Sequence, residues 1–167
     1  MTKTLILKMV DPIARKRARD LLKKIALGKM TSYECENGFL DLNPGTNDPA
    51  IFAFYRTVFE MGGDIDKPLA HLFARGSEMR KRVCRWIFFL KTDLEYEWPK
   101  EQLAPGIKDF YKPNWFDKLF GLHSRIVRSN EEFCSHGDYR IWPFFREVDL
   151  NAAKAACAQR RSAQPSS

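Results

Sequence analysis

The chain has 167 residues, of which 44% are hydrophobic and 29% are charged, and its formal net charge is +7. This composition is typical of a folded globular domain and excludes wholesale disorder. Apolar runs such as residues 86–90 are far shorter than the ~20 residues of a membrane-spanning helix, and the apolar patch near the start is too short for a secretory signal.

The excess positive charge is concentrated at the start of the chain. Residues 1–30 contain nine Lys and Arg but only two Asp, whereas acidic and basic residues balance over the rest. Asp11-Pro12 is a strong helix start, because Asp caps free backbone N–H groups and Pro suits the first helical position. We predict a helix over residues 12–27, ended by Gly28, with an apolar face and a basic face.

The next segments also carry helix signals. Thr31 and Glu34 have the spacing of a capping box, which predicts a short helix ending near Asn37-Gly38. Asp48-Pro49 predicts a second capped helix, and residues 50–61 are so apolar that this helix is expected in the core. A short helix is predicted over residues 66–73.

Ser77 is expected to cap a further helix, because apolar residues recur after it at spacings of three and four. The core is predicted to be built from the helix after Asp48 and the helix after Ser77. Its members are Phe52, Phe54, Val58, Phe59, Val83, Trp86, Ile87 and Leu90.

The second half of the chain gives weaker signals. Residues 92–99 alternate apolar and acidic side chains, which favours a half-buried extended segment. Residues 99–113 are expected to form a loop, Asn114 to cap a helix, and residues 137–145 to form a turn with an extended aromatic segment. Asp149 is expected to cap an Ala-rich helix over residues 150–161.

These elements predict a mainly α protein: a single compact domain of about five to six helices, with room for a minor two- or three-stranded element. The domain is assigned to residues 1–161, and residues 162–167 to a flexible C-terminal tail. Four widely spaced cysteines, Cys35, Cys84, Cys134 and Cys157, match neither a disulfide framework nor paired zinc ligands. We expect reduced thiols, no metal, no cofactor and a cytoplasmic location.

Three kinds of site are considered from the residues. The first is a basic surface that attracts an acidic partner or a polyanion. Its candidates are Arg15, Lys16, Arg19, Lys23, Lys24, Arg80, Lys81 and Arg82. A helix-turn-helix over residues 12–37 is disfavoured, because the second helix carries glutamates that phosphate would repel.

The second is an aromatic and arginine-rich segment with the composition of protein interfaces. Its candidates are Tyr139, Arg140, Trp142, Phe144 and Phe145. The third is the acidic row Asp93, Glu95 and Glu97, which would share one face of an extended segment and suit a hydrolase or a metal-dependent enzyme.

No nucleophile elbow or Gly-rich phosphate loop is present in the sequence. The first hypothesis is therefore a small non-enzymatic, cytoplasmic protein-interaction or regulatory domain whose partner has an acidic surface. The alternatives are a non-specific nucleic-acid or polyanion binder that uses the basic N-terminal helix, and an enzyme that uses the acidic row. Membrane insertion of the N-terminal helix is disfavoured, because its apolar face carries no aromatic residue.

Overall fold

A computed structural model describes residues 9–62, 73–99 and 122–163. These residues form six α-helices and two short 3-10 helices, and no strand is found within these three ranges. The prediction of a mainly helical fold is confirmed. The helix predicted over 66–73, the loop over 99–113 and the helix start at Asn114 fall wholly or largely outside the described residues.

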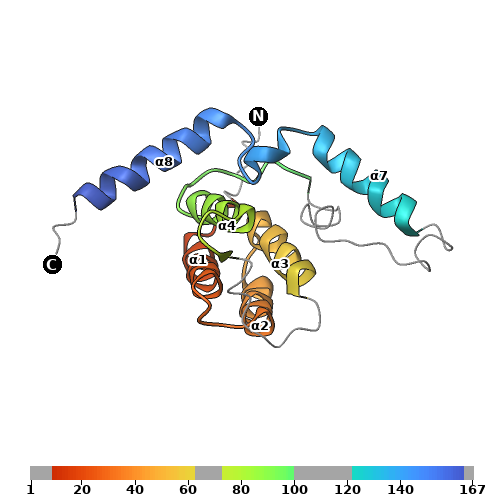
Figure 1. Ribbon diagram of the computed structural model, residues 1–167, viewed down its shortest axis with the longest axis horizontal. Helices are drawn as coiled ribbons and strands as arrows, with labels where there is room; N and C mark the ends of the chain where they lie inside the picture. Colours follow the sequence, from red (N-terminus) through yellow and green to blue (C-terminus); the bar gives the residue numbers. More distant parts are fainter. Residues whose placement is uncertain (1–8, 63–72, 100–121, 164–167) are drawn as a thin grey trace, which may run out of the picture.

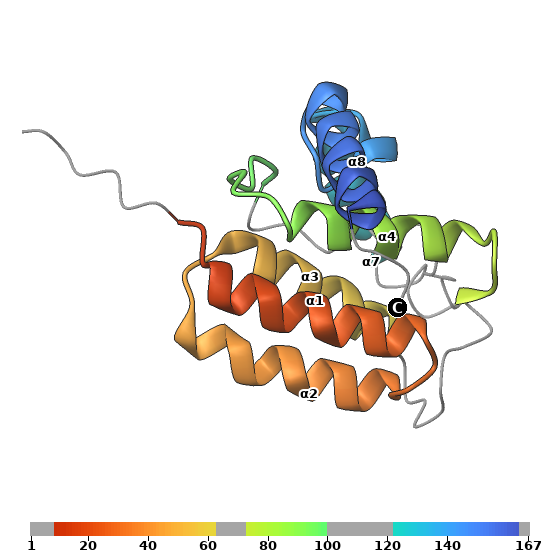
Figure 2. The same cartoon turned by 90° about the vertical axis from the view of Figure 1, so that its left-hand side faces the viewer.

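Four helices build the body of the molecule: α1 (Pro12–Ala26), α2 (Ser32–Leu42), α3 (Pro49–Gly62) and α4 (Glu78–Phe89). Helices α1, α2 and α3 lie side by side, and α4 packs over α1 and α3 (Figures 1 and 2). Helices α7 (Leu122–Ser135) and α8 (Glu147–Ser162) extend in different directions from the far side of α4 (Figure 1).

The predicted caps of the first helices are present. The Asp11 carboxylate accepts hydrogen bonds from the backbone N–H groups of Ile13 and Ala14, at 3.0 and 2.9 Å. Gly28 follows α1 with a φ of 66°, a conformation that glycine adopts without strain. Thr31 and Glu34 form the reciprocal capping box, at 2.7 and 3.1 Å.

Helix α2 is longer than its local sequence signals predict. It was predicted to end near Gly38, but it continues to Leu42. A Cβ atom at position 38 would lie 2.6 Å from Leu21 Cδ2, so the glycine lets α2 approach α1 closely. Tertiary packing here outweighs the low helix propensity of glycine.

The two Asp-Pro helix starts meet in space. Asp48 caps α3 by accepting from the Ala50 backbone N–H at 3.1 Å, and it also accepts from the Asp11 backbone N–H at 3.1 Å. The Arg15 guanidinium donates to both Asp48 carboxylate oxygens, at 2.6 and 3.2 Å, and to the Thr92 carbonyl at 2.8 Å. This network joins α1 to the start of α3 and to the segment that follows α4.

The core between α3 and α4 is aromatic. Phe54 stacks on Trp86 with ring centroids 5.6 Å apart, and Trp142 meets both rings edge-on at 5.5 and 5.4 Å. Of the predicted core residues, Phe54, Val58, Val83, Trp86 and Leu90 are buried and Ile87 is partly buried. The prediction is wrong for Phe52 and Phe59, which are 39% and 53% exposed, because α3 turns only part of its apolar surface inward.

Residues 93–98 alternate as predicted. Leu94 is half-buried and Tyr96 and Trp98 are buried, whereas Asp93, Glu95 and Glu97 are exposed. The Trp98 indole N–H donates to the Phe144 carbonyl at 3.1 Å, which packs this segment against residues 142–145.

Three predictions about the last third of the chain need correction. The segment 137–145 is not extended, because Tyr139–Ile141 forms a 3-10 helix, η3. Helix α8 begins at Glu147 rather than after Asp149, and the cap residue Arg146 makes no capping side-chain hydrogen bond. Asp149 instead lies in the first turn, where the helix dipole favours acidic residues, and its carboxylate accepts a hydrogen bond from Arg146 Nε at 2.7 Å. Ser162, assigned to the tail, is the last residue of α8.

Candidate binding groove

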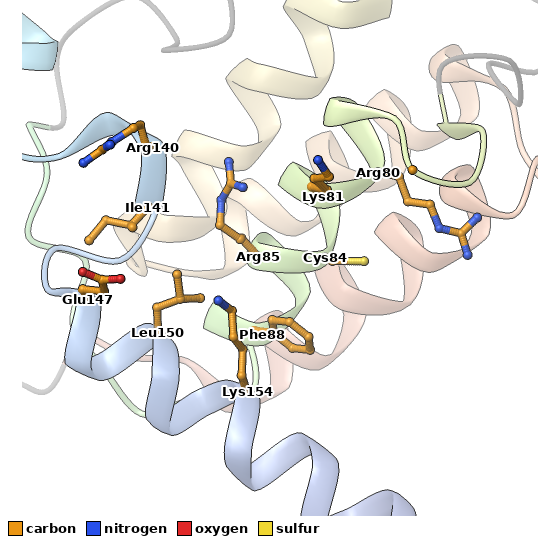
Figure 3. A pocket seen from close by; sticks show the side chains of 11 residues that line it. Arg80, Lys81, Cys84, Arg85, Phe88, Arg140, Ile141, Glu147, Leu150 and Lys154 are labelled. Carbon is orange, nitrogen blue, oxygen red and sulfur yellow. The ribbon is translucent and has the colours of Figure 1, made fainter.

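A groove of about 550 Å³ lies between α4, η3 and the first half of α8 (Figure 3). This volume falls within the roughly 300–1,000 Å³ of small-ligand pockets. The residues that line it are Gly76, Arg80, Lys81, Cys84, Arg85, Phe88, Arg140, Ile141, Glu147, Leu150 and Lys154.

Helical spacing explains why α4 provides one wall. Its lining residues lie at positions 80, 81, 84, 85 and 88, which share one face of a helix. Residues on the opposite face, including Met79, Val83 and Trp86, are buried in the core. Helix α8 supplies Glu147, Leu150 and Lys154, again spaced by three and four residues.

The groove is basic around an apolar floor. Five cationic side chains line it, against the single carboxylate of Glu147. Phe88, Ile141 and Leu150 come from three different elements and supply the apolar surface (Figure 3).

Two of the five cations already have carboxylate partners. Lys81 Nζ lies 2.6 Å from Glu78 Oε1, and this hydrogen bond lowers the pKa of Glu78. Arg140 Nη2 lies 2.8 Å from Asp138 Oδ2, and the hydrogen bond from Arg140 lowers the pKa of Asp138. Among the described residues, Arg80, Arg85 and Lys154 form no such ion pair.

Arg85 is the most confined of these three side chains. It is half-buried, and its Nε donates to the Trp142 carbonyl at 3.3 Å, which fixes the guanidinium beside η3. Burial, followed by repulsion from Arg82, lowers the pKa of Arg85 from its ordinary value. A partly desolvated positive charge of this kind gains free energy when an anion binds beside it.

The predicted basic residues do not form one surface. Lys16, Lys23 and Lys24 are exposed on α1 and Arg19 is half-buried, but the groove is lined by none of them. Arg80 and Lys81 line the groove, whereas Arg82 places its guanidinium 5.8 Å from the centroid of the Tyr139 ring. Including Arg15 was wrong, because it is 1% exposed and paired with Asp48.

The predicted aromatic interface also divides. Trp142 and Phe144 are core residues, 3% and 0% exposed, so their placement on a surface was wrong. Tyr139 is half-buried and packs edge-on against Phe133. Phe145 is exposed at 37%, and Arg140 is the one of the five predicted interface residues that lines the groove.

The acidic row does not converge on a site in the described part of the chain. Asp93, Glu95 and Glu97 are exposed, and Glu97 lies 3.9 Å from Arg146. Within residues 9–62, 73–99 and 122–163, no group of three or more His, Cys, Asp or Glu is placed to hold a metal ion.

None of the four cysteines forms a disulfide. Cys84 is exposed in the groove, whereas burial raises the pKa of Cys35 to about 12. The Lys91 amine lies 2.9 Å from Cys157 Sγ, which joins the second half of α8 to the segment that follows α4.

Sequence reasoning missed Arg85, Phe88, Ile141, Leu150 and Lys154 as members of one site. The α4 residues had a usable signal, because positions 81, 85 and 88 form a stripe opposite the apolar face. Lys154 had none, since nothing in an Ala-rich helix indicates which part of the molecule that helix faces.

In comparisons with known proteins, no family model, curated protein or solved structure matches this chain. Among the described residues, no helix has the length and apolar content needed to cross a membrane. The groove and its charged lining are therefore the features of the molecule that bear on its function.

Proposed function

We propose that this chain is a non-enzymatic interaction domain that binds an acidic segment of another protein in the α4–α8 groove. The observation that carries the proposal is the charge of the lining, five cations to one carboxylate around an apolar floor. Protein interfaces combine an apolar centre with a polar rim and are enriched in arginine. Charge complementarity would steer an acidic partner to this face and orient it there.

The experiment measures binding of a fluorescently labelled oligoglutamate peptide by anisotropy, at low and at physiological salt. The groove variant is Arg80→Gln/Arg85→Gln. The matched control is Lys16→Gln/Lys24→Gln, which removes the same net charge from exposed positions on α1, outside the groove. We expect the groove variant to lose about tenfold or more in affinity, and the control to lose less than about twofold.

Two further measurements test whether a loss of affinity comes from the groove itself rather than from misfolding. Because Arg85 contacts the Trp142 carbonyl, thermal unfolding of the groove variant must show that it is folded. Lys154→Gln, at an exposed groove position, tests the same site without changing a buried contact. If the α1 control loses affinity and the groove variants do not, the proposed site is wrong.

The nucleic-acid alternative predicts a different outcome. The exposed lysines of α1, Lys16, Lys23 and Lys24, would then contribute most of the binding. A labelled single-stranded oligonucleotide of equal charge would bind more tightly than the peptide, with a steeper dependence on salt. Tighter oligonucleotide binding that depends on the α1 lysines would replace the present proposal.

A further inference from the structure

The groove combines positive charge with an apolar floor, and this floor restricts the kinds of ligand that can fill it. This inference rests on the proposed function. Phe88 of α4, Ile141 of η3 and Leu150 of α8 surround the space between the two helices (Figure 3). Phe88 and Ile141 are only partly buried, so each retains surface that an occupant can cover.

The volume limits how much of a partner can enter. About 550 Å³ accommodates a few side chains rather than a packed helix bundle or a folded domain. A simple polyanion would satisfy the cations but leave the apolar floor in contact with water. A purely apolar segment would cover the floor but leave Arg85 partly buried without an anion.

The charges indicate where the occupant's carboxylates would lie. Lys81 and Arg140 are neutralised by Glu78 and Asp138, so they gain less from an additional anion. Neither Arg85 nor Lys154 forms an ion pair with a carboxylate of the described residues. Glu78 attracts Arg85 more weakly than Arg82 repels it, and Glu78 is already paired with Lys81. Figure 3 shows Arg85 on α4 and Lys154 on α8, on the two sides of the groove.

We infer that the groove binds a short acidic peptide segment in which one large apolar side chain is flanked by carboxylates. The apolar side chain packs against the exposed parts of Phe88 and Ile141, which lie beside the buried Leu150. A flanking carboxylate accepts hydrogen bonds from Arg85. This arrangement resembles the energetic centre of many interfaces, where an apolar anchor is surrounded by polar contacts.

The test compares three short labelled peptides of equal length with the intact protein. The first has leucine at its centre and glutamate elsewhere, the second replaces the leucine with alanine, and the third keeps leucine but replaces glutamate with glutamine. We expect the Glu/Leu peptide to bind most tightly. The alanine peptide should lose about five- to tenfold, because leucine buries more apolar surface.

A variant of the protein tests whether the lower affinity of the alanine peptide comes from lost contact with the apolar residues that line the groove. Ile141→Ser should weaken binding of the Glu/Leu peptide but hardly affect the Glu/Ala peptide, so the difference between the two peptides should shrink. The matched control is Val148→Ser, an exposed apolar residue on α8 that does not line the groove. Thermal unfolding of both variants verifies their folding.

The outcomes separate this inference from the proposal on which it rests. If the Glu/Leu and Glu/Ala peptides bind equally through Arg85, the acidic-partner function is supported and the apolar anchor is overturned. If no peptide binds, both fail. If the Gln/Leu peptide binds as well as the Glu/Leu peptide, recognition of carboxylate by Arg85 is overturned.

Discussion

Arg15 and Arg85 lie on two helices that pack together, and both are withdrawn from water, but their surroundings differ. Arg15 is fully buried against the Asp48 carboxylate, its guanidinium lies 5.0 Å from the centroid of the Phe89 ring, and it also donates to a carbonyl. Arg85 is half-buried, donates to one carbonyl and has Arg82 as its main charged neighbour. The first arginine completes a structural network, whereas the second retains positive charge that a ligand can neutralise.

Burial alone therefore does not identify a functional arginine. A buried charge with a carboxylate partner is consistent with a role in packing, and removing one partner leaves the other uncompensated. A partly buried charge among other cations leaves a positive potential to which an anion is attracted. Substitutions at each arginine should therefore affect folding and binding differently.

Removing one partner of the buried pair should cause a large loss of stability. Arg15→Met should reduce the free energy of unfolding by about 3–5 kcal/mol, because Asp48 is left buried without its counterion. Chemical denaturation measures the loss, and the neighbouring exposed change Lys16→Met should stay within about 0.5 kcal/mol. The double variant Arg15→Met/Asp48→Asn should lose less than the sum of the single changes, and simple additivity would contradict the pair.

Two phenylalanines on α3 provide the same comparison between a buried and a more exposed side chain, but for uncharged residues. Phe54 is fully buried against Trp86 and Trp142, whereas Phe59, on the same helix, is 53% exposed. Phe54→Ala should cost about 3–5 kcal/mol by creating a cavity, and Phe59→Ala should cost less than about 1 kcal/mol. Equal losses, measured by urea unfolding, would refute the assignment of the core to one face of α3.

Arg85 should contribute little to folding. Arg85→Gln loses the hydrogen bond to the Trp142 carbonyl, a contribution of about 1 kcal/mol, but it also relieves repulsion from Arg82. We therefore expect the free energy of unfolding to change by no more than about 1 kcal/mol. A loss as large as that of Arg15→Met would show that Arg85 stabilises the fold, as Arg15 does. It would contradict the assignment of Arg85 as an anion-binding residue of the groove.

A further small effect concerns pH and the hydrogen bonds by which Asp11 caps α1. The hydrogen bond from the Ala14 backbone N–H lowers the pKa of Asp11 below its usual 3.8, so the ionised carboxylate favours the folded state. Its contribution is present above the unfolded pKa and is lost as pH falls through the folded value.

The stability difference between the wild type and Asp11→Asn, at most about 1 kcal/mol, should therefore shrink between about pH 6 and about pH 3. Urea unfolding at each pH measures the difference. An advantage of the wild type that grows at low pH would have the wrong sign for this cap.

Local sequence signals determined the starts of the first helices and the fold class. Asp11-Pro12, Thr31 with Glu34, Asp48-Pro49 and Ser77 all begin helices as predicted. Capping requires only residues that are adjacent in the chain, so it can be read without knowledge of the tertiary fold. The alternating burial of residues 93–98 followed from periodicity for the same reason.

Tertiary structure decided the rest, because long-range packing determines the environment of each side chain. Arg15 and Lys16 are neighbours in a basic run, yet one is buried by an aspartate 33 residues away and the other is exposed. Gly38 locally favours a helix end, but α2 continues through it, because a residue without a side chain allows close contact with Leu21. The groove likewise exists only because α8 packs beside α4, which brings Arg85 and Lys154 to one cavity although no local pattern connects them.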